Sequence, residues 1–159
     1  MREYVVTNTQ VKAVPGDWGI WHRYTFGVAG ERFFREMKDH GRLVASVCPR
    51  CRRAFVPPSM YCEDCFVEIT EYQPVGDTGT LSSFTILYEP LDESRPLSPT
   101  VIGLVQFDGT VGGWIAPVHG VAPEKLRIGM KVRAVFKPAG QRQGQVSDLD
   151  HFEPAWSAR

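Results

Sequence analysis

Four cysteines in two matched pairs constrain this chain more than any other feature of its sequence. The pairs are Cys48-Pro-Arg-Cys51 and Cys62-Glu-Asp-Cys65, with ten residues between them. A spacing of two residues lets one tight turn aim both sulfur atoms at a single point. Two such turns close a tetrahedron around an ion about 2.3 Å from each sulfur. The pattern therefore predicts one structural Zn²⁺ per chain, bound by Cys48, Cys51, Cys62 and Cys65.

The cysteine pattern also bears on the other roles that thiols can have. Redox-active pairs are disfavoured, because the strand–helix–strand context of a thioredoxin motif is missing. Iron could occupy the same four sulfurs. Four thiolates leave no open position for a catalytic water, and the site uses every cysteine in the chain. We therefore expect a site that holds structure and leaves no free thiol as a nucleophile.

The sequence around the cysteines predicts a mainly β chain in three parts. Residues 1–47 should form an N-terminal arm and a helix from about Glu31 to His40. Residues 48–75 should form a rubredoxin-like zinc ribbon. Residues 76–159 should form a five-stranded OB barrel, because short strands follow one another with a brief helical turn after the third. The expected barrel strands are 79–88, 100–107, 109–115, 130–137 and 146–152.

Alternation along these strands predicts which side chains share a face. In the first strand we expect one face to carry Leu81, Ser83, Thr85 and Leu87, and the other to carry Ser82, Phe84, Ile86 and Tyr88. In the fourth strand the inward residues should be Met130, Val132, Ala134 and Phe136. The glycines of the third strand suggest a bulge or a tight bend.

The charge balance argues against a nucleic-acid-binding protein. Lys and Arg balance Asp and Glu at 18 each, and the balance holds locally, with seven basic against five acidic residues in 1–47, three against four in 48–75 and eight against nine in 76–159. A protein that binds nucleic acid by releasing phosphate counterions has a basic excess on one face. A single-stranded nucleic-acid-binding module stays the alternative, with candidate base-stacking residues Phe84, Tyr88, Phe107 and Trp114.

Other motifs are few. The sequence has no nucleophile elbow, phosphate loop or dinucleotide fingerprint. Arg50, Arg52 and Arg53 could contact a phosphorylated ligand or form a solvated surface. The N-terminal residues lack the apolar core of a secretory signal, and no apolar run approaches the roughly 18 residues that cross a bilayer. We therefore expect a soluble, cytoplasmic protein without membrane contact.

An ordered set of motifs across about residues 30–154 resembles a known family. The motifs are Phe33-Phe34, Gly41-Arg-Leu, Cys48-Pro-Arg-Cys51, Val56-Pro-Pro-Ser-Met-Tyr-Cys62, Cys65, Gly76-Asp-Thr-Gly-Thr80, Pro99-Thr-Val-Ile, Ile128-Gly-Met-Lys-Val132 and Phe152-Glu-Pro. They resemble the zinc-ribbon/OB acyl-CoA-associated family, long catalogued as a domain of unknown function. One departure is Arg52, which stands where a glycine often follows the second cysteine. If that position is left-handed, arginine there carries a steric cost.

The resemblance implies an accessory subunit that is not catalytic alone. Family members look like partners of thiolases, thiolase-like aldolases or CoA-ester hydratases, completing the larger subunit's acyl-CoA site. A thiolase-like catalytic subunit is thus the implied partner, in a heterotetramer of two chains of each kind, with CoA or acyl-CoA at a shared site. The arm with Trp18 and Trp21 is most similar to members that serve CoA-dependent cleavage of 2-benzoylsuccinyl-CoA to benzoyl-CoA and succinyl-CoA, in anaerobic toluene degradation.

Four aromatic residues before the cysteines are candidates for the partner interface. They are Trp18, Trp21, Phe33 and Phe34, on an arm and helix with little core of their own to join. Left exposed, such side chains form an apolar patch of a kind that a monomer rarely tolerates. The alternative for the arm is that its tryptophans pack on their own domain. We expect these four residues to contact the partner, since tryptophan is a favoured interface anchor.

Overall fold

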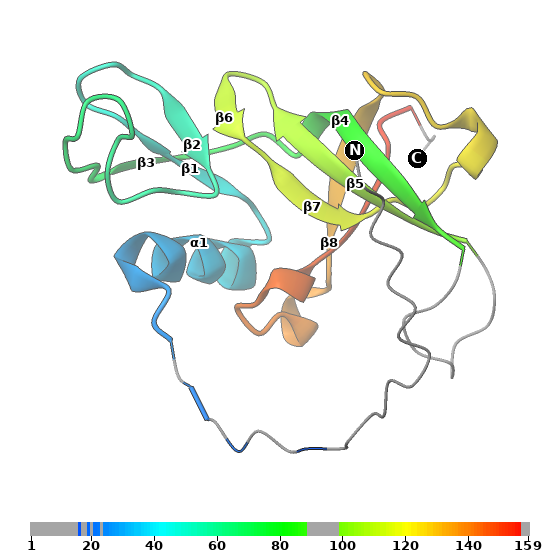
Figure 1. Cartoon of the computed structure of the whole chain (residues 1–159), viewed down its shortest axis with the longest axis horizontal. Coiled ribbons are helices and arrows are strands. Elements are labelled where there is room, and N and C mark those ends of the chain that lie inside the picture. The colour runs from blue at the N-terminus through cyan, green and yellow to red at the C-terminus, as the bar shows by residue number, and fades with distance from the viewer. Residues whose placement is uncertain (1–15, 17–18, 20, 23, 89–98, 157–159) are drawn as a thin grey trace, which may run out of the picture.

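The computed structural model, which describes residues 16, 19, 21–22, 24–88 and 99–156, has two sheets and one α-helix in these residues (Figure 1). The smaller sheet has the strand order β3 (Glu71–Pro74), β1 (Val44–Val47), β2 (Ala54–Val56) and β6 (Thr110–Gly112). The larger sheet has the order β7 (Trp114–Pro117), β5 (Thr100–Phe107), β4 (Thr78–Leu87), β8 (Lys131–Phe136) and β9 (Leu149–Pro154). The predicted mainly β class is confirmed.

The larger sheet closes on itself as an OB barrel. Strand β4 pairs antiparallel with both β5 and β8, and β5 pairs with β7. The two ends of the sheet meet where Val118 forms a parallel bridge with Phe152. There the backbone N–H of His119 donates to the Phe152 carbonyl, with 2.8 Å between nitrogen and oxygen. Between β7 and β8 the chain makes a 3₁₀ turn at Pro123–Lys125. This element order confirms the predicted five-stranded barrel.

The expected third strand, 109–115, is two strands in different sheets. Strand β6 runs parallel to β2 of the smaller sheet, whereas β7 pairs antiparallel with β5 of the barrel. The chain changes sheet at Gly112 and Gly113. A Cβ on Gly112, whose φ is +85°, would lie 2.3 Å from the Val56 carbonyl oxygen, and one on Gly113 would lie 2.5 Å from that of Val105. Only glycine fits this close backbone approach.

Helix α1 (Gly27–His40) begins one turn before the predicted start at Glu31. It ends where the sequence predicts, because Gly41 adopts a left-handed conformation with φ +60°. The N–H of Gly41 donates to the Met37 carbonyl over 3.0 Å, which satisfies one of the last helical carbonyls. No helix within the described residues is long and apolar enough to span a membrane.

One hydrophobic core joins the helix, the smaller sheet and the barrel. Phe33 of α1 is 1% exposed, and its ring centroid lies 5.0 Å from that of Trp114 on β7. The same cluster contains Val47 and Val56 of the smaller sheet and Phe152 of the barrel. The two sheets therefore share apolar contacts as well as the strand exchange at β6.

A bulge in β4 corrects the predicted faces of this strand. Its register with β5 shifts between Leu81 and Ser83. Leu81 is fully buried, but Leu87 is 37% exposed, whereas Phe84 and Ile86 pack against the core. The prediction that Leu81 and Leu87 share a face is therefore wrong, because the extra residue reverses the alternation.

The last two strands follow the predicted pattern more closely. In β8, Val132 and Ala134 are buried, and Met130 and Phe136 pack against the core from the strand's two ends, as predicted. The final strand begins later than expected, since Val146–Asp148 forms a 3₁₀ turn before β9.

Candidate metal centre and the surface beside it

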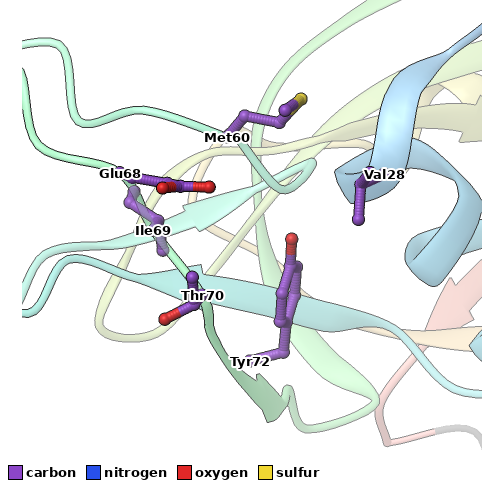
Figure 2. Close-up of a pocket in the computed structure, with 6 residues that line it drawn as sticks. All are labelled: Val28, Met60, Glu68, Ile69, Thr70 and Tyr72. Atoms are coloured by element: carbon purple, nitrogen blue, oxygen red, sulfur yellow. The ribbon is translucent and has the colours of Figure 1, made fainter.

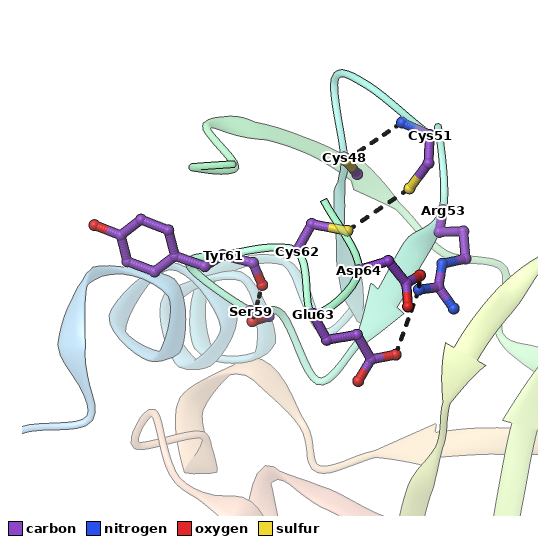
Figure 3. Close-up of polar contacts among 8 residues, drawn as sticks. All are labelled: Cys48, Cys51, Arg53, Ser59, Tyr61, Cys62, Glu63 and Asp64. Atoms are coloured by element: carbon purple, nitrogen blue, oxygen red, sulfur yellow. Dashed lines mark hydrogen bonds and ion pairs between the residues drawn. The ribbon is translucent and has the colours of Figure 1, made fainter. Parts of the chain in front are cut away.

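The four cysteine side chains meet at one point of the smaller sheet. Cys48 and Cys51 lie in the turn between β1 and β2, and Cys62 lies in the loop between β2 and β3 (Figure 3). Cys65 follows in the same loop. All four sulfur atoms lie within 4.8 Å of one another, and those of Cys51 and Cys62 are 3.7 Å apart. A tetrahedron with 2.3 Å metal–sulfur bonds has edges of about 3.8 Å, whereas a disulfide bond is about 2.05 Å long. The four thiols are thus positioned to bind a metal ion.

The two cysteine turns have the same backbone conformation. In the first, the N–H of Arg52 donates to the Cys48 carbonyl over 3.0 Å. In the second, the N–H of Phe66 donates to the Cys62 carbonyl over 2.9 Å. The residue after each second cysteine is left-handed, with φ +63° at Arg52 and +53° at Phe66. The repeat explains why a C-x₂-C spacing suffices to aim two sulfurs at one ion.

Arg52 adopts the left-handed conformation that makes arginine sterically unfavourable at this position. Its guanidinium donates to both carboxylate oxygens of Glu71 on β3, over 2.7 and 3.0 Å. This hydrogen bond lowers the pKa of Glu71 and raises the pKa of Arg52. The side chain thus ties the first cysteine turn to the edge strand, which a glycine could not do.

The metal centre has a buried side and a solvent side. Cys48 and Cys62 are buried in a small cluster with Phe55 and Ile69, whereas Cys51 is exposed. A hydrogen bond from the backbone N–H of Arg53 lowers the pKa of Cys51 to about 6.

The opposite shift affects Cys65. Burial raises the pKa of this thiol to about 12. A metal ion must displace the protons that remain on the thiols, so its affinity for the site falls as the pH falls. Four thiolates suit Zn²⁺, which would hold the two turns together without an open position for a substrate.

The structure separates the four candidate interface aromatics. Trp18 lies outside the described residues. Trp21 is 96% exposed, and Phe34 is partly buried against the core. Phe33 is 1% exposed and packs against Trp114, so the expectation that it contacts a partner is wrong. The helix does have a core to join, because the barrel places Trp114 beneath it.

The candidate base-stacking residues form no exposed platform. Phe107 is 2% exposed, and Phe84 and Trp114 pack against the core. Of these four residues only Tyr88 is largely exposed, at 66%. A stacking surface needs open aromatic faces in a row, so this arrangement does not support the nucleic-acid alternative.

Two of the three candidate phosphate-binding arginines are engaged with carboxylates. Arg52 binds Glu71, and Arg53 of the first cysteine turn pairs with Asp64 and approaches Glu63 to 3.6 Å (Figure 3). Arg53 therefore links the two cysteine turns. Its charge is neutralised within the ribbon. Arg50 and Arg52 are both exposed, and of the three arginines only Arg50 forms no ion pair with a described residue.

A cleft that sequence patterns did not indicate lies between α1 and the smaller sheet (Figure 2). We call it the ribbon cleft; its volume is about 190 Å³, and its lining residues are Val28, Met60, Glu68, Ile69, Thr70 and Tyr72. No motif joins these residues, which come from the helix, the loop between β2 and β3, and β3 itself. Only the packing of α1 beside the second cysteine turn brings them together.

Comparison with family models matches the chain in two consecutive segments. Residues 35–71 match the rubredoxin-like zinc ribbon domain of ChsH2, and residues 72–137 match the ChsH2 C-terminal OB-fold domain. The first segment contains all four cysteines, and the second contains β4, β5, β6, β7 and β8.

A comparison with individual proteins gives the same family. A DUF35 domain-containing scaffold protein of Methanothermobacter thermautotrophicus is 24% identical over 127 residues, which cover 77% of this chain and 94% of that protein.

Two solved structures share the fold. One, a DUF35-family protein of unknown function from Sulfolobus solfataricus, is 28% identical with a TM-score of 0.64, covering 80% of this chain and 86% of its own. The other, from the Ltp2–ChsH2(DUF35) aldolase, is 25% identical with a TM-score of 0.65, covering 84% of this chain and 99% of its own. The chain therefore belongs to the DUF35 family of proteins in which a ChsH2-type zinc ribbon precedes an OB-fold domain.

Proposed function

We propose that this chain is a non-catalytic subunit that supports a thiolase- or aldolase-type acyl-CoA enzyme. The observation that carries the proposal is the convergence of all four cysteines on one metal position. Thiolases form an acyl-thioester on a cysteine, and a thiolate bound to a structural metal is not free to do so. The nucleophile therefore belongs to the catalytic subunit.

The relatives support an assembly role. One is named a scaffold protein, and another belongs to an aldolase complex that pairs Ltp2 with ChsH2. In this chain, Trp21, Tyr24 and Phe26 are 96%, 84% and 61% exposed before and at the start of α1. Large apolar side chains in such positions mark protein interfaces more often than free surface. The metal centre and the barrel would hold this segment in a fixed place for the partner.

The finer proposal concerns the reaction and the composition of the complex. We place the chain in a complex that cleaves 2-benzoylsuccinyl-CoA with CoA into benzoyl-CoA and succinyl-CoA, as in the benzoylsuccinyl-CoA thiolase of anaerobic toluene degradation. Each chain would hold one Zn²⁺, and two chains would join two thiolase-like subunits, with acyl-CoA bound at a shared site. The support is the sequence resemblance of the N-terminal arm, including the exposed Trp21.

Co-expression tests this function. The full chain is produced alone and with each thiolase- or aldolase-type protein of the same genome, and the preparations are assayed for CoA-dependent cleavage of 2-benzoylsuccinyl-CoA and of a simple β-ketoacyl-CoA. We expect a stable hetero-oligomer, activity only in the complex, and higher activity there than for the catalytic subunit alone. Turnover by the isolated chain at the rate of the complex would contradict the non-catalytic role. Cleavage of the β-ketoacyl-CoA alone would contradict the specific substrate.

A further inference from the structure

The wall of the ribbon cleft is built by the second cysteine turn. The N–H of Ile69 donates to the Met60 carbonyl over 2.8 Å, and Tyr61 forms an antiparallel bridge with Glu68. These contacts lie on either side of Cys62 in the chain, and the backbone N–H of Cys62 forms a hydrogen bond across the same loop. A metal ion that fixes Cys62 therefore also fixes the positions of Met60 and Glu68.

The opposite wall is the first turn of α1. Val28 is 67% exposed and points toward the cleft (Figure 2). The helix start approaches the ribbon closely, since a Cβ on Gly27 would lie 3.4 Å from the Met60 sulfur. The residues just before it, Tyr24 and Phe26, are also largely exposed. The cleft thus lies directly beside the exposed start of α1.

Glu68 is the unpaired charge of this apolar cleft. Glu63, Asp64 and Glu71, the other carboxylates of residues 48–75, each lie within ion-pair distance of an arginine. Among the described residues, the Glu68 side chain has no ion pair or hydrogen bond. Figure 2 shows its carboxylate directed toward the space between Met60 and Val28. A carboxylate beside apolar side chains selects a cation beside an apolar group.

The size of the cleft favours a protein side chain over a cofactor. Its volume of about 190 Å³ is below the range of small-molecule pockets, which starts at about 300 Å³. We propose that the catalytic subunit docks here, inserting an apolar side chain between Val28 and Met60 and placing an adjacent Lys or Arg against Glu68. The inference rests on the proposed function for the existence of that subunit, and it names the surface and the chemistry of the contact.

Photo-crosslinking tests where the subunit docks. A photoreactive amino acid replaces Met60 in the full chain, which is co-expressed with the thiolase- or aldolase-type subunit that the co-expression experiment identifies. Ile128, 69% exposed in the turn before β8, is the control position. We expect Met60 to crosslink to a partner peptide in which an apolar residue neighbours a Lys or Arg, and Ile128 to give no such product. Crosslinks to a second copy of this chain, or none in an intact complex, would overturn the proposal.

Charge substitutions measure the contribution of each contact. Val28→Glu should weaken the complex about 30-fold, as loss of an interface anchor does. Glu68→Lys should weaken it about tenfold, and a Lys→Glu or Arg→Glu change at the crosslinked partner residue should restore binding. The matched controls are Ile128→Glu and Glu124→Lys, which should bind like wild type. Unchanged zinc content in every variant verifies that the ribbon is folded.

The two proposals can fail separately. If wild-type protein forms no complex, the proposed function fails and the docking site fails with it. If wild type binds and Val28→Glu binds equally well, the subunit role stands and this docking site is wrong.

Discussion

The ribbon and the barrel are stabilised by different interactions. Around the cysteines, the buried cluster consists of Cys48, Cys62, Phe55 and Ile69, with two partly buried neighbours. The larger core instead draws on every barrel strand, on α1, and on β1 and β2 of the smaller sheet. Burial stabilises by roughly 25 cal/mol per Å² of apolar surface, so the small cluster gains little from it. Metal binding must therefore supply the stabilising free energy that apolar burial does not provide around the cysteines.

The two regions are nevertheless joined. Strand β6 leaves the barrel to pair with β2 of the ribbon, and Phe33 of α1 packs on Trp114 of β7. Damage in one region therefore reaches the other through these contacts. We expect the extent of this damage to differ between substitutions, and the largest effect comes first.

Loss of a metal ligand should affect the ribbon most. Cys51→Ala or Cys62→Ala should abolish stoichiometric zinc and the order of residues 41–70, because structural zinc sites contribute about 10–16 kcal/mol of apparent binding energy. Metal analysis and hydrogen exchange measure the two effects. Protection in β4 and β5 should fall less than protection in the ribbon, since their core contains residues of β1 and β2 such as Val47 and Val56 but none of the cysteines. The control is Ser83→Ala, at an exposed site in β4. Full metal retention in both cysteine variants would refute the tetrathiolate site.

A cavity in the barrel should have the converse effect. Phe152 is fully buried on β9, so Phe152→Ala should lower the free energy of unfolding by about 3–5 kcal/mol. Because the ribbon keeps its ligands, the zinc content of the folded variant should match wild type. Urea unfolding together with metal analysis tests this. Zinc loss from the folded variant would show that the barrel core, and not the cysteine turns, holds the site.

Substitution of Gly112 measures how much the pairing of β6 with β2 contributes to stability. Gly112→Ala adds a Cβ 2.3 Å from the Val56 carbonyl oxygen, whereas Gly109→Ala has a similar positive φ, +75°, but open space around it. Both variants carry backbone strain, and only the first forces β6 away from β2. We expect Gly112→Ala to be less stable than Gly109→Ala by about 2 kcal/mol in urea unfolding. Equal stabilities would mean that the β2–β6 pairing contributes nothing.

The smallest expected effect distinguishes the two cysteine turns. Arg52 and Phe66 are both left-handed, but Arg52 binds Glu71 whereas Phe66 is 84% exposed. Removing the Cβ strain at Phe66 therefore sacrifices no packing. Phe66→Gly should be about 1 kcal/mol more stable than the matched variant Phe66→Ala, measured by thermal unfolding of the metal-loaded protein. A more stable alanine variant would show that the left-handed conformation there is not strained.

Short-range sequence patterns were sufficient for much of this molecule. The metal ligands follow from the C-x₂-C spacing, because each pair is held by its own turn. The end of α1 follows from Gly41, and the inward face of β8 follows from simple alternation. In each case the deciding interactions lie within a few residues along the chain, so the local sequence contains the necessary information.

Tertiary contacts decided the rest. Phe33 is buried because β7 places Trp114 against it, and Leu87 faces outward because a bulge shifts β4 against β5. Residues 109–115 divide between two sheets because Gly112 and Gly113 can approach neighbouring backbones closely. The ribbon cleft likewise combines a helix with a loop and strand more than 30 residues later in the chain. Burial, register and surface shape depend on which distant segments pack together, and that is an energy balance over the whole core that local spacing does not contain.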